Sequence, residues 1–99
     1  MEQDYLLNIL EGAHRARCGT DRLFCYVATN TDHSVNIWQL SLVEEDEPGH
    51  FPVSHDVAIG SEAQMRALAD RLNRERLKMT PDQSAHVIAS SMRGIHRQR

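Results

Sequence analysis

The sequence predicts a small α+β domain with the order α-β-β-β-α-α, in which helices pack on an antiparallel three-stranded sheet. Three observations support this fold class. Near both ends of the chain, apolar residues recur at spacings of three and four, the period of a helix with one buried face. In the middle, apolar and polar residues alternate in three runs, as in strands. In the C-terminal part of the chain, from residue 61 on, two Ser/Thr-x-x-Gln patterns mark helix starts.

The first helix is expected to begin at Asp4, whose side chain can cap it, and to end at Gly19. Its apolar residues are spaced so that they share one stripe, which we expect to face the core: Leu6, Ile9, Leu10 and Ala13.

Three strands are expected to follow. The first covers 22–28, and turn-forming residues at 30–32 join it to a returning strand over 34–43. This hairpin should have one wetter face, because polar residues alternate with Trp38 and its apolar neighbours. The third strand is expected over 53–59.

Two helices are expected to complete the domain. Residues 61–64 and 80–83 each match a capping box, and Pro81 suits a first helical position. We expect Gly94 to stop the last helix and leave a flexible basic tail over 94–99. The expected buried residues are Met65, Leu68 and Leu72 in the first of these helices, and Ala85, Ile88, Ala89 and Met92 in the second.

Size and composition predict one domain over 1–99 with a modest core, which a homodimer would help to stabilise. The chain begins without the features of a secretory signal, and no apolar run approaches the roughly 18–20 residues needed to span a bilayer. We therefore expect a cytoplasmic protein that does not associate with membranes. In that compartment Cys18 and Cys25 should be ordinary reduced thiols.

Charge is strongly segregated along the chain. Residues 23–65 hold seven acidic side chains and no lysine or arginine, whereas 66–99 hold eight basic side chains against three acidic ones. Such a separated field can guide a charged partner toward one part of the surface.

The acidic segment contains a run of four carboxylates that we expect to form an exposed loop, since each would need a partner if buried. Its members are Glu44, Glu45, Asp46 and Glu47. With Phe51 as an exposed aromatic contact, this loop would bind the basic surface of a partner protein, such as a nucleic-acid-binding host protein. The alternative is a solvated turn whose charges keep the hairpin end soluble and discourage edge pairing.

A different hypothesis is a small nucleic-acid-binding transcriptional regulator that uses the basic C-terminal helices. Its candidate phosphate contacts are Arg66, Arg74, Lys78, Arg93 and Arg97. However, Asp70 lies four residues from both Arg66 and Arg74 and can neutralise them, and no aromatic residue interleaves with the arginines to stack on bases. Protein binding is therefore the preferred hypothesis.

The sequence does not predict an enzyme, a metal site or a cofactor. Its six histidines lack the spacing of a metal-binding pair, and neither cysteine belongs to a CxxC motif. It also has no nucleophile elbow and no glycine-rich phosphate loop. We expect no catalytic residues.

Three short motifs resemble a recurring pattern in small uncharacterised proteins of phages and plasmids. They are Pro-Gly-His-Phe-Pro at 48–52, Ala-Asp-Arg-Leu-Asn at 69–73 and Ala-Ser-Ser-Met-Arg at 89–93. The resemblance covers about half the chain. It implies a short accessory gene on a mobile element, and such genes often encode binding proteins, including inhibitors of host defence such as anti-CRISPR proteins.

Overall fold

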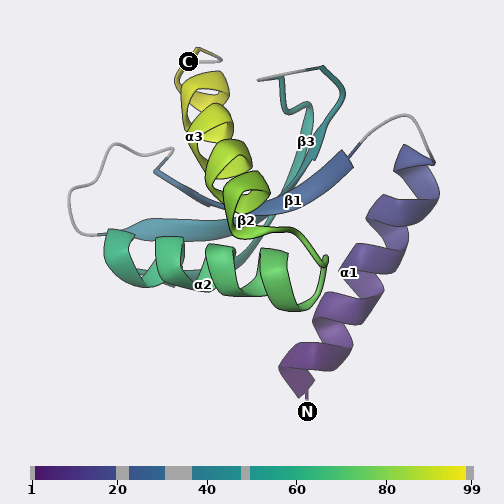
Figure 1. Ribbon diagram of the computed structural model, residues 1–99. Coiled ribbons are helices and arrows are strands. Elements are labelled where there is room, and N and C mark those ends of the chain that lie inside the picture. The colour runs from purple at the N-terminus through teal and green to yellow at the C-terminus, as the bar shows by residue number, and fades with distance from the viewer. Residues whose placement is uncertain (1, 20–22, 31–36, 48–49, 98–99) are drawn as a thin grey trace.

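The computed structural model describes residues 2–19, 23–30, 37–47 and 50–97, with side chains described between 4 and 89. It confirms the predicted order of elements and the antiparallel three-stranded sheet (Figure 1). The elements are α1 (Glu2–Cys18), β1 (Leu23–Thr29), β2 (Trp38–Glu45), β3 (Val53–Gly60), α2 (Glu62–Glu75) and α3 (Pro81–Arg97).

The strands lie in the order β1-β2-β3, so β1 and β3 form the edges of the sheet. The register shifts between Leu40 and Ser41: Leu40 pairs with Ala58, Ser41 pairs with Asp56, and Val57 of β3 is left as the extra residue of a bulge. A bulge on an edge strand increases its twist and discourages pairing with another sheet.

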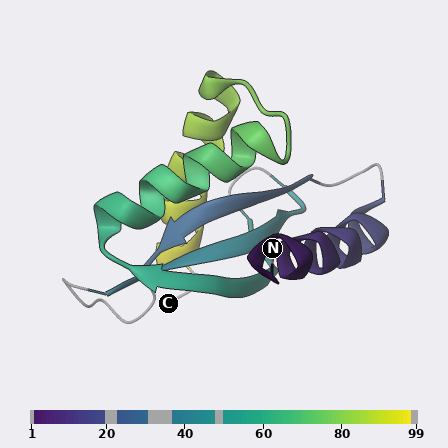
Figure 2. The same ribbon diagram turned by 90° about the horizontal axis from the view of Figure 1, so that it is seen from below.

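Helices cover both faces of the sheet (Figures 1 and 2). One face packs against α2 and α1, in a cluster that includes Tyr26, Ala28, Leu40, Leu42, Leu7, Met65, Ala69 and Leu72. The other face packs against α3 and the segments next to it, in a cluster of Cys25, Val27, Val43, Phe51 and Val87. Because β2 is buried between these layers, the predicted wetter face is wrong: Gln39 and Ser41 are both buried.

The predicted capping boxes are present at both C-terminal helices. Ser61 Oγ accepts a hydrogen bond from the Gln64 amide, and the Gln64 side chain accepts one from the Ser61 amide. Thr80 and Gln83 make the same reciprocal pair before α3. The predicted α2 stripe is also confirmed, since Met65 and Leu72 are buried and Leu68 packs on the core.

The predicted inward face of α1 is correct only for Leu10, which packs on the core; Leu6, Ile9 and Ala13 are exposed. The helix begins at Glu2, so Asp4 lies inside it, and Leu6 and Ile9 point outward with 60% and 52% of their surface exposed. The buried residues are instead Leu7, Glu11, His14 and Cys18. Three of these four are polar or carry a thiol, so a search for apolar residues passes over this face.

The predicted face of α3 is correct only in part. Ile88 is buried, but the helix turns Ser84 and Val87 inward and leaves Ala85 and Ala89 exposed. Met92 lies beyond the described side chains. The helix also continues through Gly94 to Arg97, because glycine lowers helix stability without preventing a helix.

Candidate functional site

The predicted acidic loop is divided between a strand and a turn. Glu44 and Glu45 are the last residues of β2, and Glu44 is completely buried. Asp46 and Glu47 are exposed, and the Asp46 carboxylate lies 2.6 Å from His50 Nδ1. The expectation of exposure is therefore wrong for Glu44. It is also wrong for Phe51, which is 4% exposed within the core.

The buried carboxylate of Glu44 is neutralised by α1. Its Oε2 lies 2.8 Å from His14 Nδ1 and 2.7 Å from Arg17 Nε. On the other side of the His14 ring, Nε2 lies 2.9 Å from His55 Nδ1 of β3. These four residues, His14, Arg17, Glu44 and His55, form what we call the histidine cluster.

In the histidine cluster the His14 ring lies between Glu44 and His55, with Nδ1 2.8 Å from the carboxylate and Nε2 2.9 Å from His55 Nδ1. One of the two facing ring nitrogens, His14 Nε2 or His55 Nδ1, donates the proton of the hydrogen bond between them. Burial lowers the pKa of His14 below its ordinary value, although the Glu44 charge acts in the opposite direction. The neutral form of His14 is thus favoured, and Arg17 balances the charge of Glu44.

A second polar network joins α1 to the sheet and to α2. The Tyr26 hydroxyl donates to Glu11 Oε2, and Arg76 Nε donates to the same oxygen at 2.7 Å. Burial and the hydrogen bond to Glu11 raise the pKa of Tyr26, while the Glu11 carboxylate raises the pKa of Arg76. Sequence reasoning missed this face of α1, although residues 7, 11, 14 and 18 follow a helical period of their own.

Asn73 satisfies the backbone of the edge strand β1. Its side-chain oxygen accepts from the Tyr26 amide at 2.7 Å, and its side-chain nitrogen donates to the Tyr26 carbonyl at 2.9 Å. The same nitrogen lies 3.2 Å from Ser84 Oγ of α3. The Asn73 amide thereby pairs with Tyr26 as the backbone of a neighbouring strand would.

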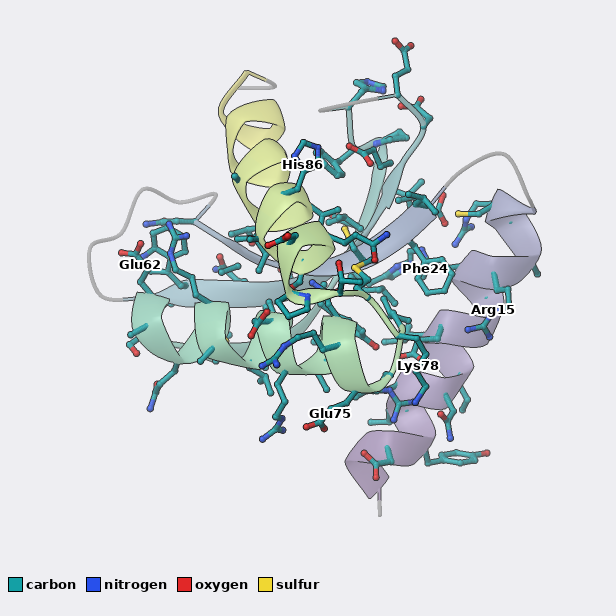
Figure 3. The ribbon with its side chains drawn as sticks, in the orientation of Figure 1. Arg15, Phe24, Glu62, Glu75, Lys78 and His86 are labelled. Atoms are coloured by element: carbon teal, nitrogen blue, oxygen red, sulfur yellow. The ribbon has the colours of Figure 1, made fainter. Side chains whose placement is uncertain are left out.

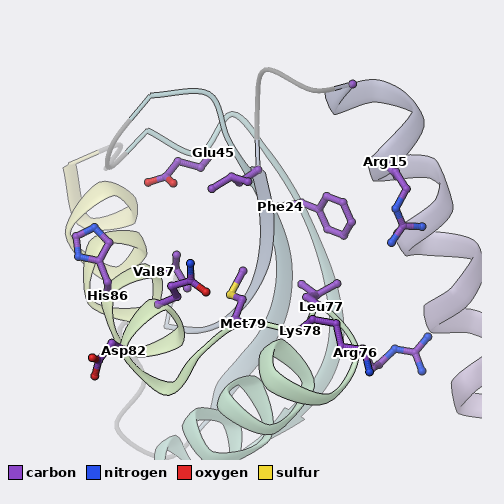
Figure 4. A pocket seen from close by; sticks show the side chains of 13 residues that line it. Arg15, Phe24, Glu45, Arg76, Leu77, Lys78, Met79, Asp82, His86 and Val87 are labelled. Carbon is purple, nitrogen blue, oxygen red and sulfur yellow. The ribbon is translucent and has the colours of Figure 1, made fainter.

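A cleft of about 930 Å³, which we call the β1 groove, opens beside the start of this strand. Its walls come from the end of α1, the start of β1, the α2–α3 connection and the first turns of α3. Apolar side chains line much of it: Leu23, Phe24, Leu77, Met79 and Val87 (Figure 4). Figure 3 places Phe24 and Lys78 on the side of the molecule where α1 ends.

Charges of opposite sign lie on opposite sides of the β1 groove. Arg15 and Arg76 stand toward α1, whereas Glu45 and Asp82 stand toward α3 (Figure 4). The Arg15 guanidinium lies 5.5 Å from the centre of the Phe24 ring, within the range of a cation–π contact. The groove can therefore receive a chain with an apolar body and charged side chains on its two sides.

The side chains of three of the predicted basic residues are described, and two of them pair with acidic residues of their own helix. Arg74 pairs with Asp70 at 2.8 Å, as its spacing predicts, whereas Arg66 pairs with Glu62 at 2.8 Å. Arg66 also lies over the Trp38 ring, 5.5 Å from its centre. Lys78 lies in the α2–α3 connection, with φ of 61°, and lines the β1 groove. The side chains of Arg93 and Arg97 lie outside the described residues.

No described helix has an apolar stretch long enough to cross a bilayer. Within the described ranges, no three histidine, cysteine or acidic side chains gather so that they could hold a metal ion. Cys18 and Cys25 are both buried free thiols.

Comparison of the chain with protein families, curated proteins and solved structures gave no match. The resemblance to small phage and plasmid proteins therefore stays a prediction. The function has to be argued from the geometry of the chain itself.

Proposed function

We propose that this protein is a protein-binding module that holds an extended segment of a partner in the β1 groove, as a strand added to the edge of its sheet. The observation that carries the proposal is the pairing of Asn73 with Tyr26. One amide already bonds to this edge in the way that an added strand would.

The direction of the strand backbone extends this argument to Phe24. In an antiparallel strand, residues that point their N–H and C=O groups to one side recur every second position. Since Tyr26 points these groups away from β2 and toward Asn73, Phe24 points its own in the same direction. Phe24 lines the β1 groove, so its backbone is placed to pair with a segment lying there.

The walls of the groove favour a particular pattern of side chains in that segment. Alternate residues of a strand point to opposite sides. Those on the α1 side would meet Phe24 and the cation of Arg15, and those on the α3 side would meet Met79 and Val87. An acidic side chain on the first side and an apolar one on the second therefore fit best.

This proposal keeps the protein-binding function that the sequence favours and moves its site. Glu44 and Phe51 are buried, so they serve the fold, whereas Glu45 is part of the groove lining. Nucleic-acid binding is less favoured, because Arg66 and Arg74 are held by acidic neighbours on the same helix.

A displayed library of random heptapeptides tests the proposal. We expect enriched peptides to shift the backbone amide NMR signals of Leu23 and Phe24 and to lose binding when a central residue is replaced by proline, which has no N–H to donate. If no peptide is enriched, or if the enriched peptides perturb other surfaces, the proposal is wrong.

Charge reversal tests the chemistry of the walls. The double variant Arg15→Glu, Lys78→Glu should bind acidic peptides about tenfold or more weakly than the wild-type protein does, and should bind their lysine-containing counterparts better. The double variant Arg71→Glu, Arg74→Glu is the matched control, because both arginines are exposed on α2, neither lines the groove, and the change in net charge is the same. Equal losses in both variants would mean that net charge, and not the groove, governs binding.

A further inference from the structure

The outward face of α1 carries a patch of large apolar side chains. Tyr5, Leu6 and Ile9 are 66%, 60% and 52% exposed, and they follow one another along the first half of the helix. Single exposed apolar residues are common on proteins, but a contiguous group marks an interaction surface. The inward face of the same helix is formed by other residues, Leu7, Glu11, His14 and Cys18, so burial in this chain does not explain why Tyr5, Leu6 and Ile9 are apolar.

The second half of this outward face is made of small residues. Gly12, Ala13 and Ala16 are all exposed. At Gly12, an added Cβ would meet no atom within 4 Å, which leaves room for a side chain from outside. The outward face of α1 therefore carries large side chains in its first half and small ones in its second half.

We propose that α1 pairs with α1 of a second copy of this chain, antiparallel and about a twofold axis. In this arrangement Tyr5 of each copy lies against Ala16 of the other, and Ile9 lies against Gly12. Small residues let two helix backbones approach closely, and the bulky side chains fill the space that they leave. A twofold interface requires such self-complementarity. Binding of a different partner protein would not require the two halves of this face to be complementary to each other.

The charges of α1 favour the same direction of pairing. The helix has Asp4 near its beginning and Arg15 in its last turn, whereas the charge of Arg17 in the same turn is balanced by Glu44. Antiparallel pairing brings acidic ends to basic ends and sets the two helix dipoles in opposition, whereas parallel pairing brings like charges together. The 17-residue helix is about 25 Å long, and a single helix pair is a small interface, so we expect the dimer to dissociate on dilution.

Sedimentation velocity over a concentration series tests the dimer. The wild-type protein should shift from monomer to dimer as concentration rises, and Ile9→Asp or Leu6→Asp should weaken the dimer by about tenfold or more. Ile59→Asp is the matched control, because Ile59 of β3 is 70% exposed and lies on a different element. A wild-type monomer at the highest soluble concentration, or an equal effect of Ile59→Asp, would overturn the proposal.

Cysteine cross-linking tests the antiparallel direction. A mixture of the single variants Tyr5→Cys and Ala16→Cys should form a mixed disulfide on oxidation, since such a bond needs Cα atoms within about 7 Å. Either variant alone should form few cross-links, as should the wild-type protein, whose Cys18 and Cys25 are buried. Preferred 5–5 and 16–16 products would overturn the arrangement. Peptide binding in the β1 groove should be unchanged in Ile9→Asp, so the two proposals can fail separately.

Discussion

Asn73 is the residue on which the edge of the sheet most depends, since it supplies both a donor and an acceptor to Tyr26. Asn73→Leu keeps similar volume and leaves these buried backbone groups without partners, so we expect a loss of about 2–3 kcal/mol in the free energy of unfolding. Urea denaturation measures it. Ser84→Ala is the control: it removes one neighbour of Asn73 and leaves the Tyr26 pairing in place, so its loss should be smaller. An Asn73→Leu protein as stable as wild type would contradict the assigned role.

The thiol of Cys25 should be inert in the native protein. Burial raises its pKa to about 12, and the nearby Glu45 adds to the shift, so the reactive thiolate is scarce. We expect no reaction with a thiol reagent at mildly alkaline pH until the chain is unfolded. Both cysteines should react in denaturant, which serves as the control. Rapid labelling of the native protein at Cys25 would show that this core cluster opens readily.

Glu44 shows where reasoning from neighbouring residues fails. Its three acidic neighbours indicate an exposed loop, but its counter-charge is Arg17 and its other close polar neighbour is His14, both about 30 positions earlier in the chain. No local pattern contains this pairing. The prediction that Phe51 is exposed fails for the same reason: its position next to an acidic run suggests exposure, but its side chain packs in the core.

Among the elements, α2 and α3 begin as their sequences predict, because a capping box is a purely local arrangement. Ser61→Ala should lower the free energy of unfolding by about 1 kcal/mol, since one amide of the first turn loses its partner. Ser61→Asp should restore most of the loss, because aspartate is an equally good cap. Thermal or urea denaturation distinguishes the two. Equal stability of the alanine and aspartate variants would mean that the cap contributes nothing here.

The sequence predicts that the first helix exists and about how long it is, but not which of its faces points toward the core. Hydrophobic periodicity identifies a helical face correctly when the core alone determines which residues are apolar. In α1, Glu11 and His14 point inward because they have buried partners, while Leu6 and Ile9 remain on the surface. The apolar stripe is a real feature of the sequence, but of its members only Leu10 packs on the core.

Across the whole molecule, stability should fall as the solution becomes acidic. The folded state lowers the pKa of His14 below its ordinary value of about 6.5, so the unfolded chain binds more protons at low pH. The contribution is complete above about pH 6.5 and is lost as pH falls through that value toward the lower pKa of the folded state. The groups that face His14 are Glu44, Arg17 and His55.

Urea denaturation at a series of pH values measures this dependence. His14→Gln should be less stable than wild type at neutral pH and should show a flatter decline below it. His86→Gln, a change at an exposed histidine of α3, should keep the wild-type slope. If the free energy of unfolding of His14→Gln falls with pH as steeply as that of the wild-type protein, His14 is not the cause of the pH dependence.

The overall architecture was predictable because period, turn residues and caps agree along the chain. The β1 groove was not predictable, because its lining comes from α1, β1, the end of β2, the α2–α3 connection and α3. Its existence depends on how α2 and α3 pass around the β1 edge, with Asn73 bonded to Tyr26 between them. Such an arrangement follows from tertiary packing and leaves no short motif.

The position of Trp38 allows fluorescence to distinguish unfolding of the sheet and α2 from release of α1 alone. This single tryptophan is 8% exposed beneath Arg66 of α2. It begins β2, whereas the last turn of α1 contacts Glu44 near the other end of that strand. Its fluorescence therefore reports the integrity of the sheet and α2. Release of α1 alone would leave that emission nearly unchanged while reducing the circular dichroism signal of helices. The two spectra recorded together would separate local opening from global unfolding without any added label.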